Sequence, residues 1–172
     1  MNYNPKCCSE PGYRFALEQK GEKMLFIVGL NPSTADEKQA DRTMSKVMRF
    51  VEENGYDGYV MLNLSAERTP DPDKLSKELN EAMHRRNLET IAGFAERYPD
   101  ADILLAFGNG IGSKRYLRSC FRDICSILQK HPRAWKYIAL TKYGHPRHPL
   151  YLSEKLKFQP FDIETYLESL GK

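Results

Sequence analysis

The sequence MLFIVGL at residues 24–30, followed directly by NPSTAD at residues 31–36, decides the fold. Its first part is a short, continuous apolar run, which is typical of a strand buried on both faces of a sheet. Its second part is a polar loop rich in turn-forming residues. The same succession of apolar run and loop recurs at residues 59–62 with 63–70, 103–107 with 108–114, and 137–140 with 141–149.

Between these runs, apolar residues recur at the spacing of amphipathic helices. The first stripe ends at Asn54 and Gly55, as a helix C-terminus does. A longer stretch is expected to begin with residues 70–73, and a third is expected to stop before Pro132. The stripes consist of Met44, Val47, Met48 and Val51; of Leu75, Leu79, Met83, Leu88, Ile91, Ala92 and Ala95; and of Leu117, Phe121, Ile124 and Leu128.

Alternating strands and helices predict an α/β protein with three layers, α/β/α, in which helices cover both faces of a sheet. We expect a mostly parallel central sheet of four strands. Residues 13–18 are expected to add an antiparallel N-terminal edge strand, joined to the first apolar run by a hairpin turn at Gly21. The prediction is a single domain over residues 1–172, with its core at about 13–152 and a terminal helix at about 161–170.

Composition and charge limit the kinds of partner. The 172 residues are 41% hydrophobic, which is enough for one sizeable core. The net charge of +3 is too small to indicate a polyanion partner by itself. A basic cluster follows the third run at helical spacing, and it fits either a solvated helix face or a local contact with an anion. Its members are Lys114, Arg115, Arg118 and Arg122.

The cysteines do not predict a metal site or a disulfide framework. Cys7 and Cys8 are adjacent, and Cys120 and Cys125 have no matching pair downstream, so free thiols in a reducing compartment are expected. No apolar run approaches the ~18 residues of a membrane helix, and the first residues do not resemble a signal peptide. We therefore expect a cytoplasmic protein with no membrane partner.

The polar loops are the candidate site, because ligands of parallel α/β sheets bind beyond the carboxyl ends of the strands. Asn63 directly follows the second run, and its amide either is buried and satisfied by backbone or points into the crevice. A carboxamide offers both a donor and an acceptor, which suits the edge of a nucleobase. The first loop crowds together Asn31, Pro32, Ser33, Thr34, Asp36 and Asp41.

The third loop contains a glycine cluster, GNGIGSK at residues 108–114. Its spacing matches neither a dinucleotide fingerprint nor a P-loop, so no cofactor is expected. A tight turn with Ser113 as the N-cap of the next helix is the simplest interpretation. Backbone amides at such a helix start can still receive a phosphate, which makes Gly108, Asn109, Ser113 and Lys114 candidate binding residues.

The last loop, HPRHP at residues 145–149, places His145 and His148 beside Arg147. Two histidines without a third ligand make a weak metal site, so no metal is expected. A neutral imidazole in a loop stiffened by proline is better suited to donate a hydrogen bond to a developing anion. One preorganised donor of this kind is typically worth roughly 10²–10³ in rate.

Three of these segments resemble a known family. The motifs GLNPSTA at residues 29–35, NLSAERTPDP at residues 63–72, and GHPRHPLY at residues 144–151 are similar to the bacterial family called domain of unknown function 1643. More distantly, the same motifs resemble the uracil-DNA glycosylase superfamily. That second resemblance also covers LLAFG at residues 104–108 with the turn to Lys114.

The glycosylase resemblance implies a role for each matched residue. Asn31 would position the attacking water, Asn63 would recognise the base, and His148 would stabilise the departing base. Asn31 stands where the most efficient uracil enzymes have Asp, so general-base help would come from Asp36 or Asp41. Leu150 or Tyr151 would enter a duplex while the nucleotide flips into the pocket.

These observations predict a glycosylase-like domain that binds a nucleobase, a nucleotide or a flipped base in DNA, with hydrolysis of an N-glycosidic bond as its reaction. One alternative is a catalytically silent module that binds a nucleotide or a nucleic-acid end. Another is hydrolysis of a small nucleotide-like substrate with Asp36 or Asp41 as base. The candidate catalytic residues are Asn31, His148, Asp36 and Asp41, and the candidate binding residues are Asn63, Pro32, Ser33, Thr34, Arg68, Gly108, Asn109, Ser113, Lys114, His145, Arg147 and Tyr151.

Overall fold

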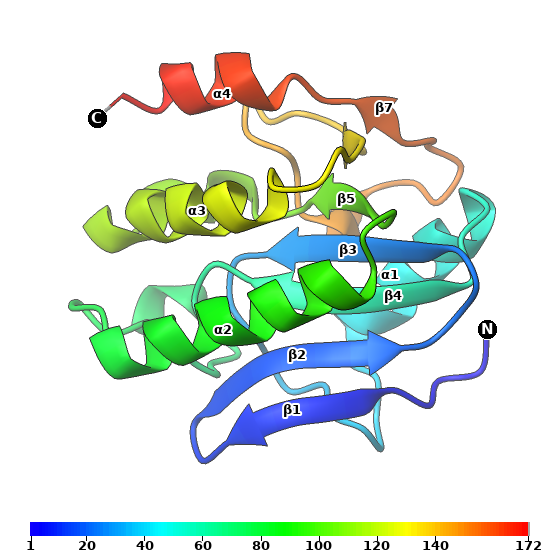
Figure 1. Cartoon of the computed structure of the whole chain (residues 1–172), viewed down its shortest axis with the longest axis horizontal. Helices are drawn as coiled ribbons and strands as arrows, with labels where there is room; N and C mark the ends of the chain where they lie inside the picture. Colours follow the sequence, from blue (N-terminus) through cyan, green and yellow to red (C-terminus); the bar gives the residue numbers. More distant parts are fainter. Residues whose placement is uncertain (172) are drawn as a thin grey trace.

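The computed structural model describes residues 1–171. Over these residues the chain forms a seven-stranded sheet in the order β1-β2-β4-β3-β5-β6-β7, together with four α-helices (Figure 1). The predicted α/β class is confirmed. The strands are β1 (Lys6–Glu10), β2 (Tyr13–Gln19), β3 (Met24–Gly29), β4 (Gly58–Asn63), β5 (Asp102–Leu105), β6 (Trp135–Tyr137) and β7 (Gln159–Pro160). The helices are α1 (Arg42–Glu53), α2 (Glu81–Arg97), α3 (Arg115–Leu128) and α4 (Ile163–Ser169).

The sheet is mixed, and it is larger than the sequence predicts. Strand β3 runs parallel to β4 and to β5, and β5 runs parallel to β6. Both ends of the sheet are antiparallel, because β1 pairs with β2, β2 with β4, and β6 with β7. The strands β1 and β7 were not predicted, since β1 carries few apolar residues and β7 has only two residues.

The predicted hairpin between residues 13–18 and the first apolar run is wrong. Strand β4 lies between β2 and β3, so the two consecutive strands are not neighbours. Gly21 is needed for a different reason: a Cβ there would lie 2.4 Å from the backbone of Asp57 and Gly58. The glycine therefore lets the connection to β3 pass close to the start of β4.

The helix predictions hold for α1, α3 and α4 and fail at the start of α2. Asp71 caps only a 3-10 turn, Pro72–Lys74, and α2 begins later because the side chain of Asn80 accepts the amide of Met83. The proposed N-cap role of Ser113 is also wrong. Ser113 ends the 3-10 helix η2 (Gly108–Gly112), and Lys114 occupies the N-cap position of α3 without a side-chain hydrogen bond.

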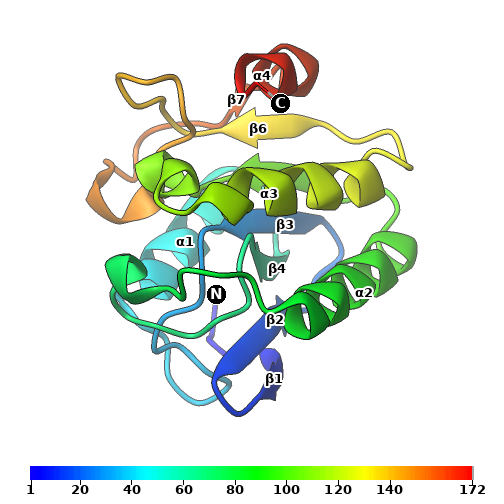
Figure 2. The same cartoon turned by 90° about the vertical axis from the view of Figure 1, so that its left-hand side faces the viewer.

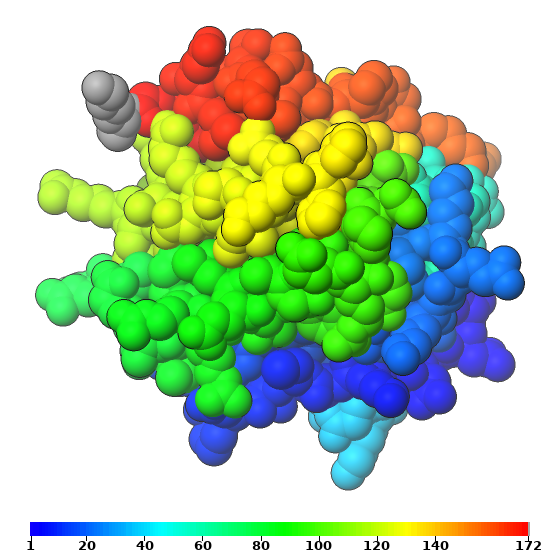
Figure 3. All heavy atoms as spheres, in the orientation of Figure 1, coloured from blue at the N-terminus to red at the C-terminus, as the bar shows by residue number. Residues whose placement is uncertain are grey.

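Two apolar clusters lie on the two faces of the sheet. The first contains Ile91 of α2 and Phe121 of α3, and the second contains Val47 and Phe50 of α1. Figures 1 and 2 show α2 and α3 on one face and α1 on the other. In Figure 3 the side chains of α2 and α3 lie side by side and cover their face of the sheet, with α4 next to α3. Neither layer of helices covers the carboxyl ends of the central strands β3 and β4.

Candidate functional site

A cavity of about 410 Å³ lies at the carboxyl ends of β3, β4 and β5, and we call it the central cavity. Its volume falls within the range of small-molecule sites. The loops that form it lie on the side of the molecule that faces the viewer in Figure 2. It is lined by Arg14, Gly29, Leu30, Asn31, Ser33, Asp41, Thr43, Met44, Met61, Asn63, Thr69, Pro70, Pro72, Phe107, Gly108, Asn109, Gly110, His148, Leu150 and Tyr151.

Asn63 is the last residue of β4, and its side chain lacks every hydrogen bond it could make. The residue is 1% exposed, and neither Oδ1 nor Nδ2 has a partner within the described residues. Its backbone carbonyl accepts a bond from Nδ2 of Asn87 in α2. Leaving a buried amide unpaired costs roughly 1–3 kcal/mol. A ligand in the cavity would supply the missing partners.

His148 begins the 3-10 helix η3 (Pro149–Tyr151), and the backbone amide of Leu150 donates to its Nδ1 at 3.3 Å. This bond requires Nδ1 without a proton, so the neutral ring carries its proton on Nε2. Burial lowers the pKa of His148 below its usual 6.5, and the nearby Asp41 carboxylate opposes this only in part. The ring is therefore a neutral Nε2–H donor near pH 7.

Asn31 and Asp41 both line the cavity, but their side chains are already engaged. Nδ2 of Asn31 donates to the carbonyls of Pro32 and Thr69, which holds the loops after β3 and β4 together. The carboxylate of Asp41 caps α1 by accepting the amide of Met44 and also accepts that of Ala35. Asp41 is the one carboxylate among the described residues that line the cavity.

Arg14 of β2 is a cavity residue that sequence reasoning missed. It is 3% exposed, and its Nη1 donates to the carbonyl of Ala35 at 2.5 Å. Nothing in the local sequence signals this position, because an arginine within a strand usually faces solvent. Burial depends on the loop after β3 folding over it, which is a tertiary contact.

The glycine loop and the histidine loop meet at the cavity. The amide of Gly108 donates to the carbonyl of Pro146 at 2.7 Å, and Gly108 adopts a positive φ of 61°. Phe107 forms an apolar wall and packs edge-on against Phe121 of α3. Tyr151, which is 83% exposed, stands at the rim.

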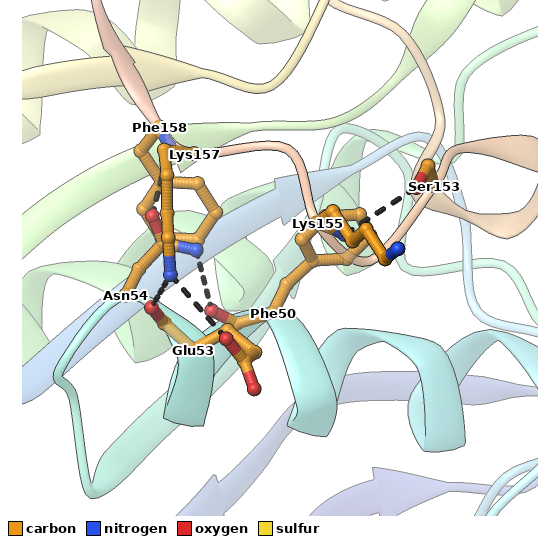
Figure 4. A network of polar contacts seen from close by, with 7 residues as sticks. All are labelled: Phe50, Glu53, Asn54, Ser153, Lys155, Lys157 and Phe158. Atoms are coloured by element: carbon orange, nitrogen blue, oxygen red, sulfur yellow. Dashed lines mark hydrogen bonds and ion pairs between the residues drawn. The ribbon is translucent and has the colours of Figure 1, made fainter.

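The segment after His148 is fixed to the C-terminal end of α1 (Figure 4). Oδ1 of Asn54 accepts the amide of Phe158 at 2.8 Å, while its Nδ2 donates to the carbonyl of Phe50. Lys157 contacts both the carbonyl and the carboxylate of Glu53. These bonds tie the chain beyond η3 to a rigid helix, which supports the position of the histidine loop.

Half of the candidate residues lie outside the lining of the central cavity. Asp36 accepts the amides of Lys38 and Gln39 in a turn, and these bonds lower the pKa of its carboxyl. His145 points elsewhere, with its Nδ1 2.7 Å from the hydroxyl of Tyr166 in α4. The others outside the lining are Pro32, Thr34, Arg68, Ser113, Lys114 and Arg147, whereas Asn31, Ser33, Asp41, Asn63, Gly108, Asn109, His148 and Tyr151 lie in it.

Within residues 1–171, no group of three or more His, Cys, Asp or Glu side chains is placed to hold a metal ion. Over the same part of the chain, no helix is long and apolar enough to cross a bilayer. His84 of α2 is buried and lies 2.9 Å from a carboxylate oxygen of Asp123.

Comparison with known proteins assigns the chain to a family. Residues 14–150 match the family described as Protein of unknown function (DUF1643), so the chain belongs to that family. No curated protein and no solved structure matches the chain. The expected resemblance to uracil-DNA glycosylases finds no support in these comparisons.

Proposed function

We propose that the central cavity binds the base of a nucleotide and that the protein hydrolyses its N-glycosidic bond. The unpaired amide of Asn63 is the observation that carries this proposal. A buried amide with both atoms free fits a planar ligand edge that offers one acceptor and one donor together. Nucleobases present such edges, and the apolar wall at Phe107 suits the face of a ring.

His148 and Asp41 supply the chemistry in this proposal. A water molecule attacks the anomeric carbon as the bond to the base nitrogen breaks, and the base leaves with the bonding electrons. The Nε2–H of His148 donates to a carbonyl oxygen of the departing base, on which negative charge develops. Asp41 accepts the proton of the attacking water, and it is favoured over Asn31 because an amide is not a useful base.

The glycosylase motifs support the same assignment of Asn63 and His148. The parallel neighbours β4, β3, β5 and β6 carry the matched loops at one edge of the sheet. We propose that this part of the molecule corresponds to the glycosylase core. The remaining strands β1, β2 and β7 are additions to it.

Base release tests the proposal. The purified chain would be incubated with single-stranded and duplex oligonucleotides containing uracil or other deaminated bases, and with a panel of nucleosides and nucleotides, and free base would be measured by chromatography. We expect release from at least one substrate, and loss of ~10²-fold or more of that rate in His148→Ala. Lys130→Gln, a surface change far from the cavity, serves as the control.

A silent binding module is the second candidate, and the bonds already made by Asp41 favour it. Both oxygens of this carboxylate accept backbone amides, so the one carboxylate of the cavity lining is engaged in holding the start of α1. This candidate predicts saturable binding without any product, and Asn63→Ala would then weaken binding. Absence of both binding and base release across the whole panel would reject both functions.

A further inference from the structure

Arg14 is a buried cation without a protein anion. Within residues 1–171 no carboxylate forms an ion pair with it, whereas the buried Glu18 is paired with Arg97. Its Nε is buried and makes no hydrogen bond in the described part of the chain. Burying a charge is costly unless it is paired and hydrogen-bonded. One backbone carbonyl, that of Ala35, accounts for only part of its donors.

No anionic group within the described residues lies in direct contact with Arg14. Burial and the neighbouring Arg68 both lower the pKa of Arg14, whereas Asp41 opposes the shift. Asp41 is not a direct partner of Arg14, because its two oxygens accept backbone amides at the start of α1. The guanidinium keeps its charge at neutral pH, since arginine is not deprotonated in proteins.

We propose that Arg14 binds the phosphate of a free nucleoside 5′-monophosphate that occupies the central cavity. This inference rests on the proposed function, because the base of the same ligand would face Asn63. A guanidinium presents a planar fork of donors that matches phosphate oxygens, and such charge-assisted pairs are the strong ones. Arg14 and Asn63 line one cavity of about 410 Å³, so a single small ligand can reach both.

The depth of Arg14 favours a free nucleotide over DNA. With 3% of its surface exposed, Arg14 offers almost nothing to a backbone that runs over the outside of the protein. A phosphate that reaches it must enter the cavity. A terminal monoester can do so, whereas a phosphodiester within a strand is held at the surface by its neighbours on both sides.

Calorimetric titration of the full chain tests the inference with four common nucleosides and their 5′-monophosphates. For the base that binds, we expect the monophosphate to bind about 10- to 100-fold more tightly than the nucleoside. In Arg14→Gln the two affinities should become similar while nucleoside affinity is retained. Lys130→Gln removes the same charge from an exposed site and should keep the wild-type ratio.

Each alternative outcome has a distinct meaning. Nucleoside binding with no preference for the monophosphate in the wild type overturns the role of Arg14 and leaves the proposed function standing, even if Arg14→Gln fails to fold. A different outcome is an oligonucleotide that binds more tightly than any monophosphate and loses about 10- to 100-fold in affinity in Arg14→Gln. This result would assign the bound phosphate to DNA and overturn the proposal of a free nucleotide.

Failure of the proposed function can also be told apart from failure of this inference. If no nucleoside or nucleotide binds, the base-binding proposal is rejected. Thermal unfolding with inorganic phosphate then tests whether Arg14 binds an anion. Arg14→Lys keeps the charge but lacks the planar fork of guanidinium donors. Stabilisation by phosphate that is lost in this variant would still support an anion site. No stabilisation by phosphate would reject the anion site as well.

Discussion

Nδ2 of Asn87 in α2 donates a hydrogen bond of 3.1 Å to the backbone carbonyl of Asn63 at the end of β4. Asn87 is 1% exposed, so no water can replace this bond without local opening. The helix thus holds the strand end from one face of the sheet, while the amide of Asn63 stays free for the cavity.

Asn87→Ala should therefore destabilise the protein by about 1–3 kcal/mol, because it leaves the carbonyl of Asn63 buried without its donor. Urea unfolding measures this free energy. Glu89→Ala, an exposed change on the same helix, should stay within about 0.5 kcal/mol of the wild type. Equal stability of the two variants would mean that the Asn87 bond does not support the strand end.

Asn63→Leu should leave the free energy of unfolding unchanged or raise it, while ligand binding is lost. An apolar side chain of similar size removes an unpaired buried amide, and such replacements are neutral or stabilising. Functional residues commonly lower stability in this way. Thermal unfolding and titration of the same preparation give both quantities. A loss above about 1 kcal/mol would instead show that the amide has a structural partner.

Stability should fall as the pH drops below about 6.5, the ordinary pKa of histidine. Burial lowers the pKa values of His148 and His145 in the folded chain, and Arg118 contributes at His145. The unfolded chain then binds protons that the folded chain does not. The contribution of the two histidines to stability is fully present above their pKa in the unfolded chain. It is lost as the pH falls through their lower pKa values in the folded chain.

Chemical unfolding at a series of pH values between neutral and mildly acidic conditions measures this dependence. His148→Gln should show a smaller loss over the same window, because one of the two groups no longer titrates. If the free energy of unfolding of the wild type does not change over this pH window, the burial of both rings is contradicted.

Gly29→Ala should weaken ligand binding, because a Cβ at position 29 would lie 2.9 Å from Oδ1 of Asn63 and 2.6 Å from the methyl group of Met61. Both contacts are with side chains, so we expect the amide of Asn63 to shift while the backbone stays in place. Gly93→Ala is the matched control. It lies in open space on α2 and should raise stability by about 0.5–1 kcal/mol. Unchanged affinity for the ligand in Gly29→Ala would show that the amide of Asn63 does not contact the ligand.

The sequence by itself determined the local elements of this protein. The run at residues 24–30 became β3, whose six residues are all buried, and the Met44 and Leu117 stripes became α1 and α3. Periodicity reports which side of an element is apolar, and burial follows from it. The positions of Asn63 at the end of a strand and of His148 in a loop beyond one also followed from the order of the elements.

Only the tertiary structure decided which strands are neighbours and which polar groups have partners. Strand β4 enters between β2 and β3, which no local signal near Gly21 reveals. The two histidines of one short loop have different environments, since His145 contacts Tyr166 and His148 lines the cavity. Arg14 is buried by residues far along the chain. Hydrogen bonding and charge compensation depend on such distant contacts, so they cannot be determined from sequence spacing.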